Sequence, residues 1–476
     1  MITFFICIAV LVAAYFIYGG FIEKQFGADP DRPTPAITQH DGVDFVPLSN
    51  ARIFLIQFLN IAGLGPIFGA IAGALWGPVA FIWIVLGCIF IGSVHDYFSG
   101  MLSIRHKGAS IPEIVGMYLG NGTKNFMRVF AVGLLIIVGV VFVKGPAAIL
   151  QGITGVDVTI LVIGIFVYYL LATMIPIDKL IGRIYPVFGL SLLIMAVGIT
   201  VTMVFGGYKI PELVPGNLVN MHSESSSFPI FPLLFITIAC GAVSGFHSTQ
   251  SPLMARCLPN EKDGKKIFFG AMITEGIVAL IWAAIAMAFF GGVSDLGVSF
   301  AEAKNNAAPI VNEICNSLLG KVGGILALIG VVAAPITSGD TAFRSARLTI
   351  ADSFKIKQGK LIQRLYVTVP IFLVAIILTQ VDFGIVWRYF GWANQTLSVF
   401  VLWTAAVYMR KTTGKYWFVL IPAVFMTSVV ISYILIAPEG FQLDQNISYS
   451  VGIASGLLGM GFYLYSTGKA RLALTE

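Results

Sequence analysis

The sequence carries very little charge. Of its 476 residues, 11% are charged and 57% are hydrophobic, and the mean hydropathy is +0.90. A soluble domain carries about 25% charged residues, so this chain lacks the polar side chains that a water-facing surface requires. The composition excludes an ordinary soluble domain and predicts an integral protein of the lipid bilayer.

Motifs for several kinds of chemistry are also missing. There is no G-x-x-x-x-G-K-[ST] loop for ATP, no H-E-x-x-H and no G-x-S-x-G. The five cysteines and five histidines have no metal or haem spacing. We therefore expect no catalytic residues, no metal and no cofactor. The net charge of +6 does not predict nucleic-acid binding, because its location in loops explains it better.

Long apolar stretches predict about thirteen transmembrane helices, since each span requires about 20 mostly apolar residues. The first stretch has no basic region before it, which argues against a cleaved signal peptide. The predicted spans are Ile2–Ile22, Ile53–Trp76, Val79–Met101, Phe126–Leu150, Val158–Ile175, Ile184–Phe205, Phe228–Ser251, Ile267–Phe290, Val322–Ser338, Leu361–Leu378, Phe383–Met409, Trp417–Ile436 and Ile447–Ser466.

The lysines and arginines support this count and give it a direction. With the N-terminus outside, 24 of the 29 fall in inner loops or the C-terminal tail, and three fall in outer loops. Lys144 and Arg388 fall within spans. Because cytoplasmic loops carry the excess of basic residues, we expect the C-terminus in the cytoplasm.

Two of the predicted spans are interrupted by glycine and proline. The first reads NIAGLGPIFG at residues 60–69, and the second reads CGAVSGFHSTQSP at residues 240–252. Such breaks free backbone N–H and C=O groups, which membranes tolerate only against protein, water or a ligand. Simple kinks are the alternative. The candidate substrate-binding residues here are Asn60, Gly63, Gly65, Pro66, Gly241, Ser244, His247, Ser248 and Gln250.

The positions of the two breaks predict internal symmetry. They fall in spans two and seven, which run in opposite directions, as in a five-plus-five inverted repeat. The fold class is therefore an all-α membrane protein with a leucine-transporter-like core, one extra N-terminal helix and two extra C-terminal helices. We expect half-helix N-termini at the breaks to attract carboxylates. The expected segments are 1–50, 51–205 (first repeat), 228–409 (second repeat) and 415–476.

Ionisable groups inside spans are costly and mark functional candidates. His95 and Asp96 form either a proton relay or a structural pair. Glu275 either carries a coupling proton or pairs with a cation. Lys144 either pairs with a carboxylate, attracts an anionic substrate or extends to the outer interface.

Two further polar groups are candidates. Thr337, Ser338 and Asp340 form an oxygen cluster suited to Na⁺, or else a helix end with Asp340 facing the cytosol. Arg388 near Asn394 is a candidate clamp for a carboxylate, or else it binds Asp382. The coupling ion is therefore H⁺ or Na⁺.

Several motifs together resemble the carbon starvation protein A family of bacterial transporters. They are RPTP (32–35), DGVDFVP (41–47), AGLGPIFG (62–69), HD (95–96), TIACGAVSGFH (237–247), PITSGDTAFR (335–344) and WRYFGWANQT (387–396). The chain resembles a short form, without the longer C-terminal region of some members. It departs from better-known members at His95, where Gln is typical, and at the STQSP that follows His247.

The resemblance implies uptake of peptides or pyruvate during nutrient limitation, across the bacterial inner membrane. We therefore expect an ion-coupled secondary importer with alternating access, and leave its oligomeric state open. A membrane nutrient sensor that binds without transport is the main alternative. A channel requires a continuous polar stripe, and a membrane enzyme requires a nucleophile–base or metal constellation; the sequence has neither.

Overall fold

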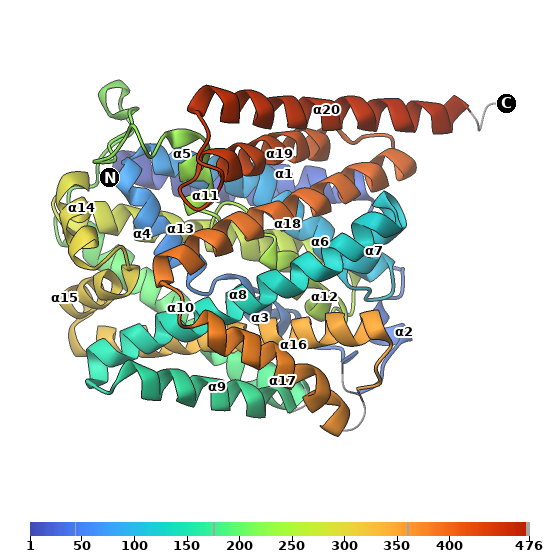
Figure 1. Cartoon of the computed structure of the whole chain (residues 1–476), viewed down its shortest axis with the longest axis horizontal. Helices are drawn as coiled ribbons and strands as arrows, with labels where there is room; N and C mark the ends of the chain where they lie inside the picture. The colour runs from blue at the N-terminus through green and yellow to red at the C-terminus, as the bar shows by residue number, and fades with distance from the viewer. Residues whose placement is uncertain (43, 175–176, 359–360, 473–476) are drawn as a thin grey trace.

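The computed structural model describes residues 1–42, 44–174, 177–358 and 361–472, and these residues form helices and no β-strand. The long helices lie side by side and run in nearly the same direction across the view (Figure 1). Ile175, the predicted end of the fifth span, lies outside the described residues. Among the described residues, the long helices are α1 (Ile2–Phe26), α8 (Asn121–Thr154), α9 (Val158–Met174), α10 (Ile177–Phe205), α13 (Gly270–Phe289), α15 (Ala307–Ala327), α16 (Ala334–Phe354), α17 (Leu361–Leu378), α18 (Phe383–Thr412), α19 (Trp417–Ile436) and α20 (Gln445–Leu472).

Within the described residues, eight helices are long and apolar enough to cross a bilayer, and one bent pair of helices makes a ninth candidate. Each of the thirteen predicted spans overlaps at least one helix. The multi-pass, all-helical class is thus present, while the number thirteen and the inverted repeat stay predictions.

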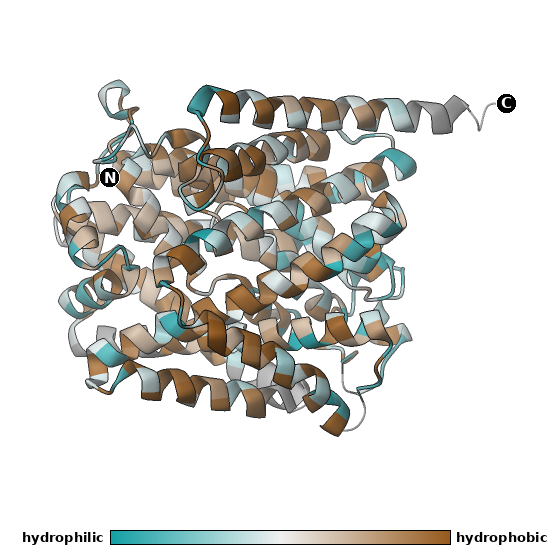
Figure 2. Cartoon of the chain, in the orientation of Figure 1, coloured by the Kyte–Doolittle hydropathy of each residue, from teal (hydrophilic) through white to brown (hydrophobic). Residues whose placement is uncertain are grey.

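The outer helices present apolar side chains to their surroundings. Large exposed residues such as Ile163 on α9, Leu373 on α17 and Leu458 on α20 project from the bundle, and Figure 2 shows apolar colouring over α9 and α17. Helix α13, in contrast, is enclosed by its neighbours, and Trp282 at its centre is fully buried. A surface of this kind is stable against hydrocarbon and not against water.

Both predicted interruptions are present. Helix α3 (Asn50–Ile61) ends before a break, and the chain resumes as η1 (Gly65–Gly69), α4 (Ala70–Gly73) and η2 (Ala74–Trp76), bent by 52°. In the second segment, η5 (Ile230–Leu234) and α11 (Phe235–Thr237) are followed by a non-helical stretch before α12 (Phe246–Ala255). Gly241 lies in that stretch with φ +91°, a conformation that side chains with a Cβ rarely adopt.

The ninth predicted span differs from expectation at both ends. Helix α15 (Ala307–Ala327) is kinked at Gly320, and η8 (Leu328–Ala333) continues into α16 (Ala334–Phe354). Helix α16 therefore extends well beyond Ser338, because no helix breaker other than Gly339 follows and that glycine packs against Tyr169. Asp340 is fully buried, so the alternative in which it faces the cytosol is wrong.

Candidate functional site

The two broken segments pack directly against each other. A Cβ placed on Gly65 would lie 2.2 Å from Cys240 Cβ, and one on Gly69 would lie 3.0 Å from the carbonyl oxygen of Thr237. Real Cβ atoms do not approach so closely, so glycine is required at Gly65 for this packing. The predicted meeting of the two glycine-rich breaks is therefore observed, with Pro66 lying 3.8 Å from a Cβ placed on Gly241.

Backbone and side-chain polar groups are left over at the breaks. Among the described residues, no backbone hydrogen bond outside the helices satisfies the N–H groups of Gly63, Leu64 and Gly65. The side chain of Asn60 is fully buried and neither of its polar atoms has a hydrogen-bond partner. Buried polar groups in native proteins are nearly always satisfied, so this first break has the donors that a bound solute would use.

Four titratable side chains form a continuous buried chain beside the breaks. His95 Nδ1 lies 2.8 Å from Asp96 Oδ1, and Asp96 Oδ2 lies 2.9 Å from His247 Nδ1. His247 Nε2 lies 3.5 Å from Glu275 Oε2. All four side chains are fully buried. The sequence offered them as separate candidates, and the structure joins them into one row across three elements.

The local packing explains how these elements meet. Helix α6 (Ser93–Arg105) carries His95 and Asp96, and it is preceded by η3 (Cys88–Gly92). A Cβ on Gly92 would lie 2.2 Å from the carbonyl oxygen of Ala242, so α6 rests on the second break. Gly276 on α13 packs closely against Cys88, because a Cβ added to Gly276 would lie 2.5 Å from Cys88 Sγ.

Two members of this row form, with Cys240, a group of side chains that could hold a metal ion. Cys240, His247 and Glu275 each offer one ligand atom, and these atoms lie within 4.8 Å of one another. Three such side chains are also what a proton pathway uses. The expected absence of a metal stays a prediction.

The oxygen cluster on α16 is engaged in internal hydrogen bonds. Thr337 Oγ1 donates to the carbonyl of Ala334, and Ser338 Oγ lies 3.1 Å from the carbonyl oxygen of Leu59 in the first broken segment. Tyr185 Oη donates to Asp340 Oδ2 at 3.0 Å, and Arg344 Nη2 lies 4.0 Å from the same oxygen. Asp340 is thus part of a second, separate buried network.

Asn394 on α18 caps the second half-helix. Its side-chain oxygen accepts hydrogen bonds from Phe246 N at 2.9 Å and Ser244 Oγ at 3.3 Å, and its carbonyl accepts from Gly245 N. The predicted carboxylate site at the start of α12 is therefore already filled by an amide of the protein itself. Ser248 Oγ donates to Gly245 O, and Gln250 Nε2 donates to Thr249 Oγ1, so both side chains bond within this segment.

Lys144 and Arg388 lie apart from the row of titratable groups. Lys144 Nζ donates to the carbonyls of Thr379 and Val381, just beyond the end of α17. Arg388 Nε lies 3.0 Å from Glu439 Oε2. The alternative pairing of Arg388 with Asp382 is not what forms, because Asp382 caps its own helix by accepting from Ile385 N.

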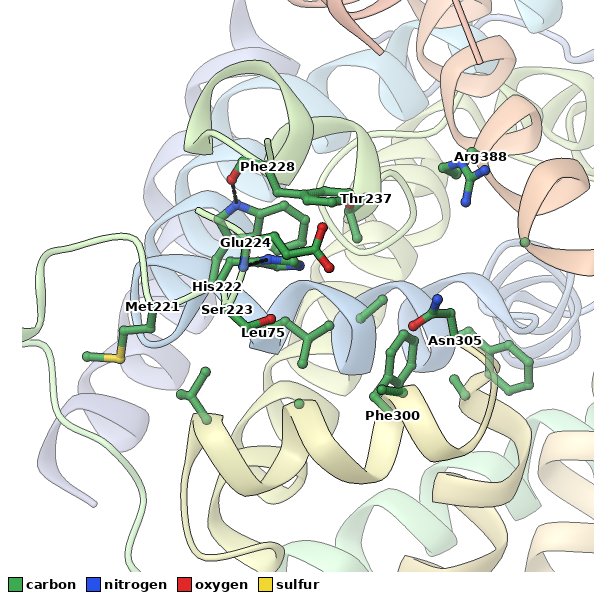
Figure 3. A pocket seen from close by; sticks show the side chains of 18 of the residues that line it. Leu75, Met221, His222, Ser223, Glu224, Phe228, Thr237, Phe300, Asn305 and Arg388 are labelled. Carbon is green, nitrogen blue, oxygen red and sulfur yellow. Dashed lines mark hydrogen bonds between the residues drawn. The ribbon is translucent and has the colours of Figure 1, made fainter. Parts of the chain in front are cut away.

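A cavity of about 950 Å³ opens beside Trp76 and Phe228, at the end of the first broken segment and the start of the second. Its walls include Phe68 and Thr237 from those segments, Arg388 from α18, and His222 and Glu224 from the chain between α10 and η5 (Figure 3). His222, Glu224 and Trp76 were not predicted. They lie in or beside a polar loop, and the sequence criterion, an ionisable residue within an apolar span, does not apply to residues there.

Comparisons with known proteins agree with this architecture. At 14% identity, the structure of MhsT in complex with L-phenylalanine matches with a TM-score of 0.59, covering 86% of this chain and 99% of that one. A mutant of the manganese transporter of Eremococcus coleocola matches with a TM-score of 0.52 at 11% identity, covering 88% and 95%. At such identities the likeness concerns the fold, which is that of solved transporters.

Proteins matched by sequence are more similar in identity to this chain than these solved structures are. An uncharacterized membrane protein of Haemophilus influenzae is 47% identical over 61% of this chain and 91% of its own length. The peptide transporter CstA of Bacillus subtilis is 25% identical over 92% of this chain and 89% of its own. The pyruvate/proton symporter BtsT of Escherichia coli is 29% identical over 58% of this chain.

That match to BtsT covers 47% of the symporter's length, so the chain spans about half of this relative. The relatives with a named activity are transporters and not enzymes. The profile of the carbon starvation protein CstA family matches residues 1–153 and 146–281. The chain belongs to the carbon starvation protein CstA family.

Proposed function

We propose that this protein is a secondary active importer of a small carboxylate-bearing solute, either a peptide or pyruvate, driven by protons. The solute would bind at the two breaks, and the two halves of the core would alternate around it as inverted repeats. The names of the relatives, peptide transporter CstA and pyruvate/proton symporter BtsT, support both solute classes.

The observation that carries this proposal is the buried row from His95 through Asp96 and His247 to Glu275. Histidine titrates close to neutral pH, and an uncompensated carboxylate in a low-dielectric site is costly unless it takes up a proton. Two histidines alternating with two carboxylates can therefore pass a proton along the row. The row touches the second break through His247, so a proton and a solute would influence each other's binding.

The buried row and the name of the relative BtsT, a pyruvate/proton symporter, support H⁺ as the coupling ion, whereas the oxygen cluster on α16 does not distinguish H⁺ from Na⁺. The hydroxyls of Thr337 and Ser338 already donate to carbonyl oxygens, and Asp340 already faces Tyr185 and Arg344. Because a hydroxyl that donates its proton keeps its oxygen lone pairs, these hydrogen bonds leave the oxygens able to bind a cation.

The test is uptake into proteoliposomes of labelled pyruvate and labelled di- and tripeptides, under imposed proton or sodium gradients. We expect accumulation only with the proton gradient. Glu275→Gln keeps the shape of the side chain but removes its titration, so proton-driven accumulation should fall about 100-fold, the scale of a lost proton-transfer group. Exchange of solute across the membrane without a gradient should persist.

Glu302→Gln, on the exposed end of α14 (Val293–Glu302), is the matched control and should transport normally. Equal proton-driven uptake by Glu275→Gln and the unmodified protein would reject the row as the coupling device. Saturable binding without uptake under either gradient would instead identify the protein as a sensor.

A further inference from the structure

The cavity beside Trp76 and Phe228 is a separate feature from the buried row of His95, Asp96, His247 and Glu275. Its volume of about 950 Å³ lies at the upper end of the 300–1,000 Å³ typical of sites for drug-sized ligands. A three-carbon acid would fill a small part of it. The size therefore suits a solute of several residues in length.

One wall of the cavity is a loop held in a fixed position. Trp76 Nε1 donates to the carbonyl of Phe228 at 3.0 Å, and Asn220 Nδ2 donates to the same oxygen at 2.8 Å. The ring of His222 packs against both aromatic rings, with centroids 4.7 Å from Trp76 and 4.5 Å from Phe228. The loop is thus tied to the end of the first broken segment.

This loop presents Glu224 to the cavity. His222 Nδ1 accepts a hydrogen bond from the backbone N–H of Glu224 at 3.1 Å, which fixes the backbone of Glu224. The carboxylate itself is exposed and has no hydrogen bond or ion pair among the described residues. Figure 3 shows it extending into the cavity.

Arg388 supplies the opposite charge on another wall. Its Nε is held 3.0 Å from Glu439, whose side chain is 5% exposed and also accepts from Tyr433 Oη. The two Nη groups have no hydrogen bond among the described residues, while 40% of the Arg388 side chain is exposed. A guanidinium held by one nitrogen, with the other two available, is arranged to receive a carboxylate.

Aromatic rings also line the cavity. The ring of Trp387 is 5.6 Å from that of Phe68 and 5.9 Å from that of Phe383. Near Glu224, the rings of Trp76 and Phe228 pack against His222, and Trp76 is 3% exposed, so they form an apolar wall. Apolar surface together with two separated opposite charges matches a solute with charged ends and a less polar middle.

From these observations we infer that the cavity is a recognition site for short zwitterionic peptides, with the free amino terminus at Glu224 and the free carboxyl terminus at Arg388. This inference rests on the proposed function, because it names the solute that the importer would first capture. It also assigns a role to Glu224, which the transport mechanism above does not use.

The test measures equilibrium binding of labelled trialanine to the purified protein in detergent, without any ion gradient. Unlabelled competitors are trialanine, N-acetyl-trialanine, trialanine amide, dialanine, alanine and pyruvate. Blocking either terminus should weaken competition about tenfold, the scale of one charge-assisted hydrogen bond. Pyruvate and alanine should compete more weakly than dialanine or trialanine.

Two variants link each terminus to its residue. Glu224→Gln should weaken trialanine about tenfold and leave N-acetyl-trialanine unchanged. Arg388→Lys keeps a cation beside Glu439 but loses the planar pair of donors, so it should weaken trialanine and leave trialanine amide unchanged. Glu302→Gln, which does not line the cavity, should bind every competitor as the unmodified protein does.

Equal weakening of blocked and unblocked peptides by either variant would overturn the inference, as would pyruvate competing as well as trialanine. Melting temperatures of the variants separate misfolding from lost recognition. Because no gradient is applied, intact terminus-dependent binding with no proton-driven uptake would uphold this site while rejecting the proposed function.

Discussion

The two ends of the helix bundle differ in how closely they are packed around the broken segments. At one end, near α14 in Figure 1, the cavity of about 950 Å³ reaches the first and second broken segments. We call this the vestibule end. At the opposite end, residues 27–42 and 44–49 are tied to residues 256–263, and we call this the sealed end. There Leu48 N donates to Cys257 O at 3.1 Å, and Thr34 Oγ1 donates to Pro259 O at 3.3 Å.

The charged side chain of Glu261 is buried and paired at the sealed end, whereas those of Glu224 and Arg388 at the vestibule end are exposed. At the sealed end, Glu261 is fully buried, forms an ion pair with Arg105 and lies 3.8 Å from Arg32. At the vestibule end, Glu224 and the Nη groups of Arg388 face open space. A buried pair resists separation, whereas exposed charges bind solutes readily. In the alternating-access cycle that we propose, this arrangement is one state, and the positive-inside rule predicts that its sealed end lies in the cytoplasm.

The largest effect should come from the close contact between the two broken segments. Gly65→Ala would place a Cβ 2.2 Å from that of Cys240, so the two broken segments must separate. Displacements of about 1 Å at a reacting site can cost 100-fold in rate, and we expect a loss of uptake of about that size. Proteoliposome uptake measures it.

Gly133→Ala is the control for that substitution, because it adds the same methyl group within α8 where nothing lies within 4 Å. It should transport normally. If Gly65→Ala transports as well as Gly133→Ala, then the close approach of the breaks is not needed for function, and the breaks lose their place as the solute site.

Glu261→Gln should weaken the sealed end. Losing one partner of a buried ion pair costs about 3 kcal/mol, so the melting temperature should fall. A native reporter lies beside this residue: burial raises the pKa of the Cys257 thiol to about 11, and only the thiolate reacts with alkylating reagents. If Glu261→Gln opens the sealed end, the pKa of the Cys257 thiol should return toward its ordinary value of about 8.5. Alkylation of Cys257 should then be faster.

The acceleration has a defined pH dependence. At pH 8 the thiolate fraction is about 0.1% at a pKa of about 11 and about 24% at a pKa of about 8.5, so a full return of the pKa makes the thiolate about 200-fold more abundant and Glu261→Gln should label faster. Above pH 11 both forms are thiolates and the advantage should shrink to the difference in access alone. Labelling is assigned to Cys257 by peptide mass spectrometry. Unchanged labelling with an unchanged melting temperature would remove Glu261 from the seal.

Much of the site could be predicted because its signals are local in the sequence. Gly65 followed by Pro66, and Gly241 within CGAVSG, are local signals for a break, and both breaks are present, although the pair Gly145 and Pro146 lies within the continuous helix α8. His95, Asp96, His247 and Glu275 each stand out as ionisable groups in apolar segments. Their union into one row depends on glycine contacts such as Gly92 against Ala242, and no sequence pattern gives a contact between residues 150 positions apart.

The same limit explains the departures. Arg388 pairs with Glu439, which belongs to a different helical hairpin and lies after α19, so nearby Asp382 was the natural partner to expect. Asn394 looked like a solute ligand because it is polar and within a span, yet it caps α12, a helix far from it in sequence. Glu224 lies in a polar loop, where carboxylates are common. Only the cavity that it lines distinguishes it from other loop carboxylates, and the sequence does not show that cavity.

The smallest expected effect concerns the loop that forms the vestibule wall. Trp76→Phe keeps an aromatic ring beside His222 but removes the hydrogen bond to the carbonyl of Phe228. A single neutral hydrogen bond contributes about 1 kcal/mol, so trialanine binding should weaken about fivefold while the melting temperature stays nearly constant. Trp417→Phe, at the exposed start of α19, controls for the loss of an indole. Because Trp76 holds the loop and not the seal, Cys257 labelling should remain slow in Trp76→Phe; faster labelling would mean that the two ends are coupled through the first broken segment.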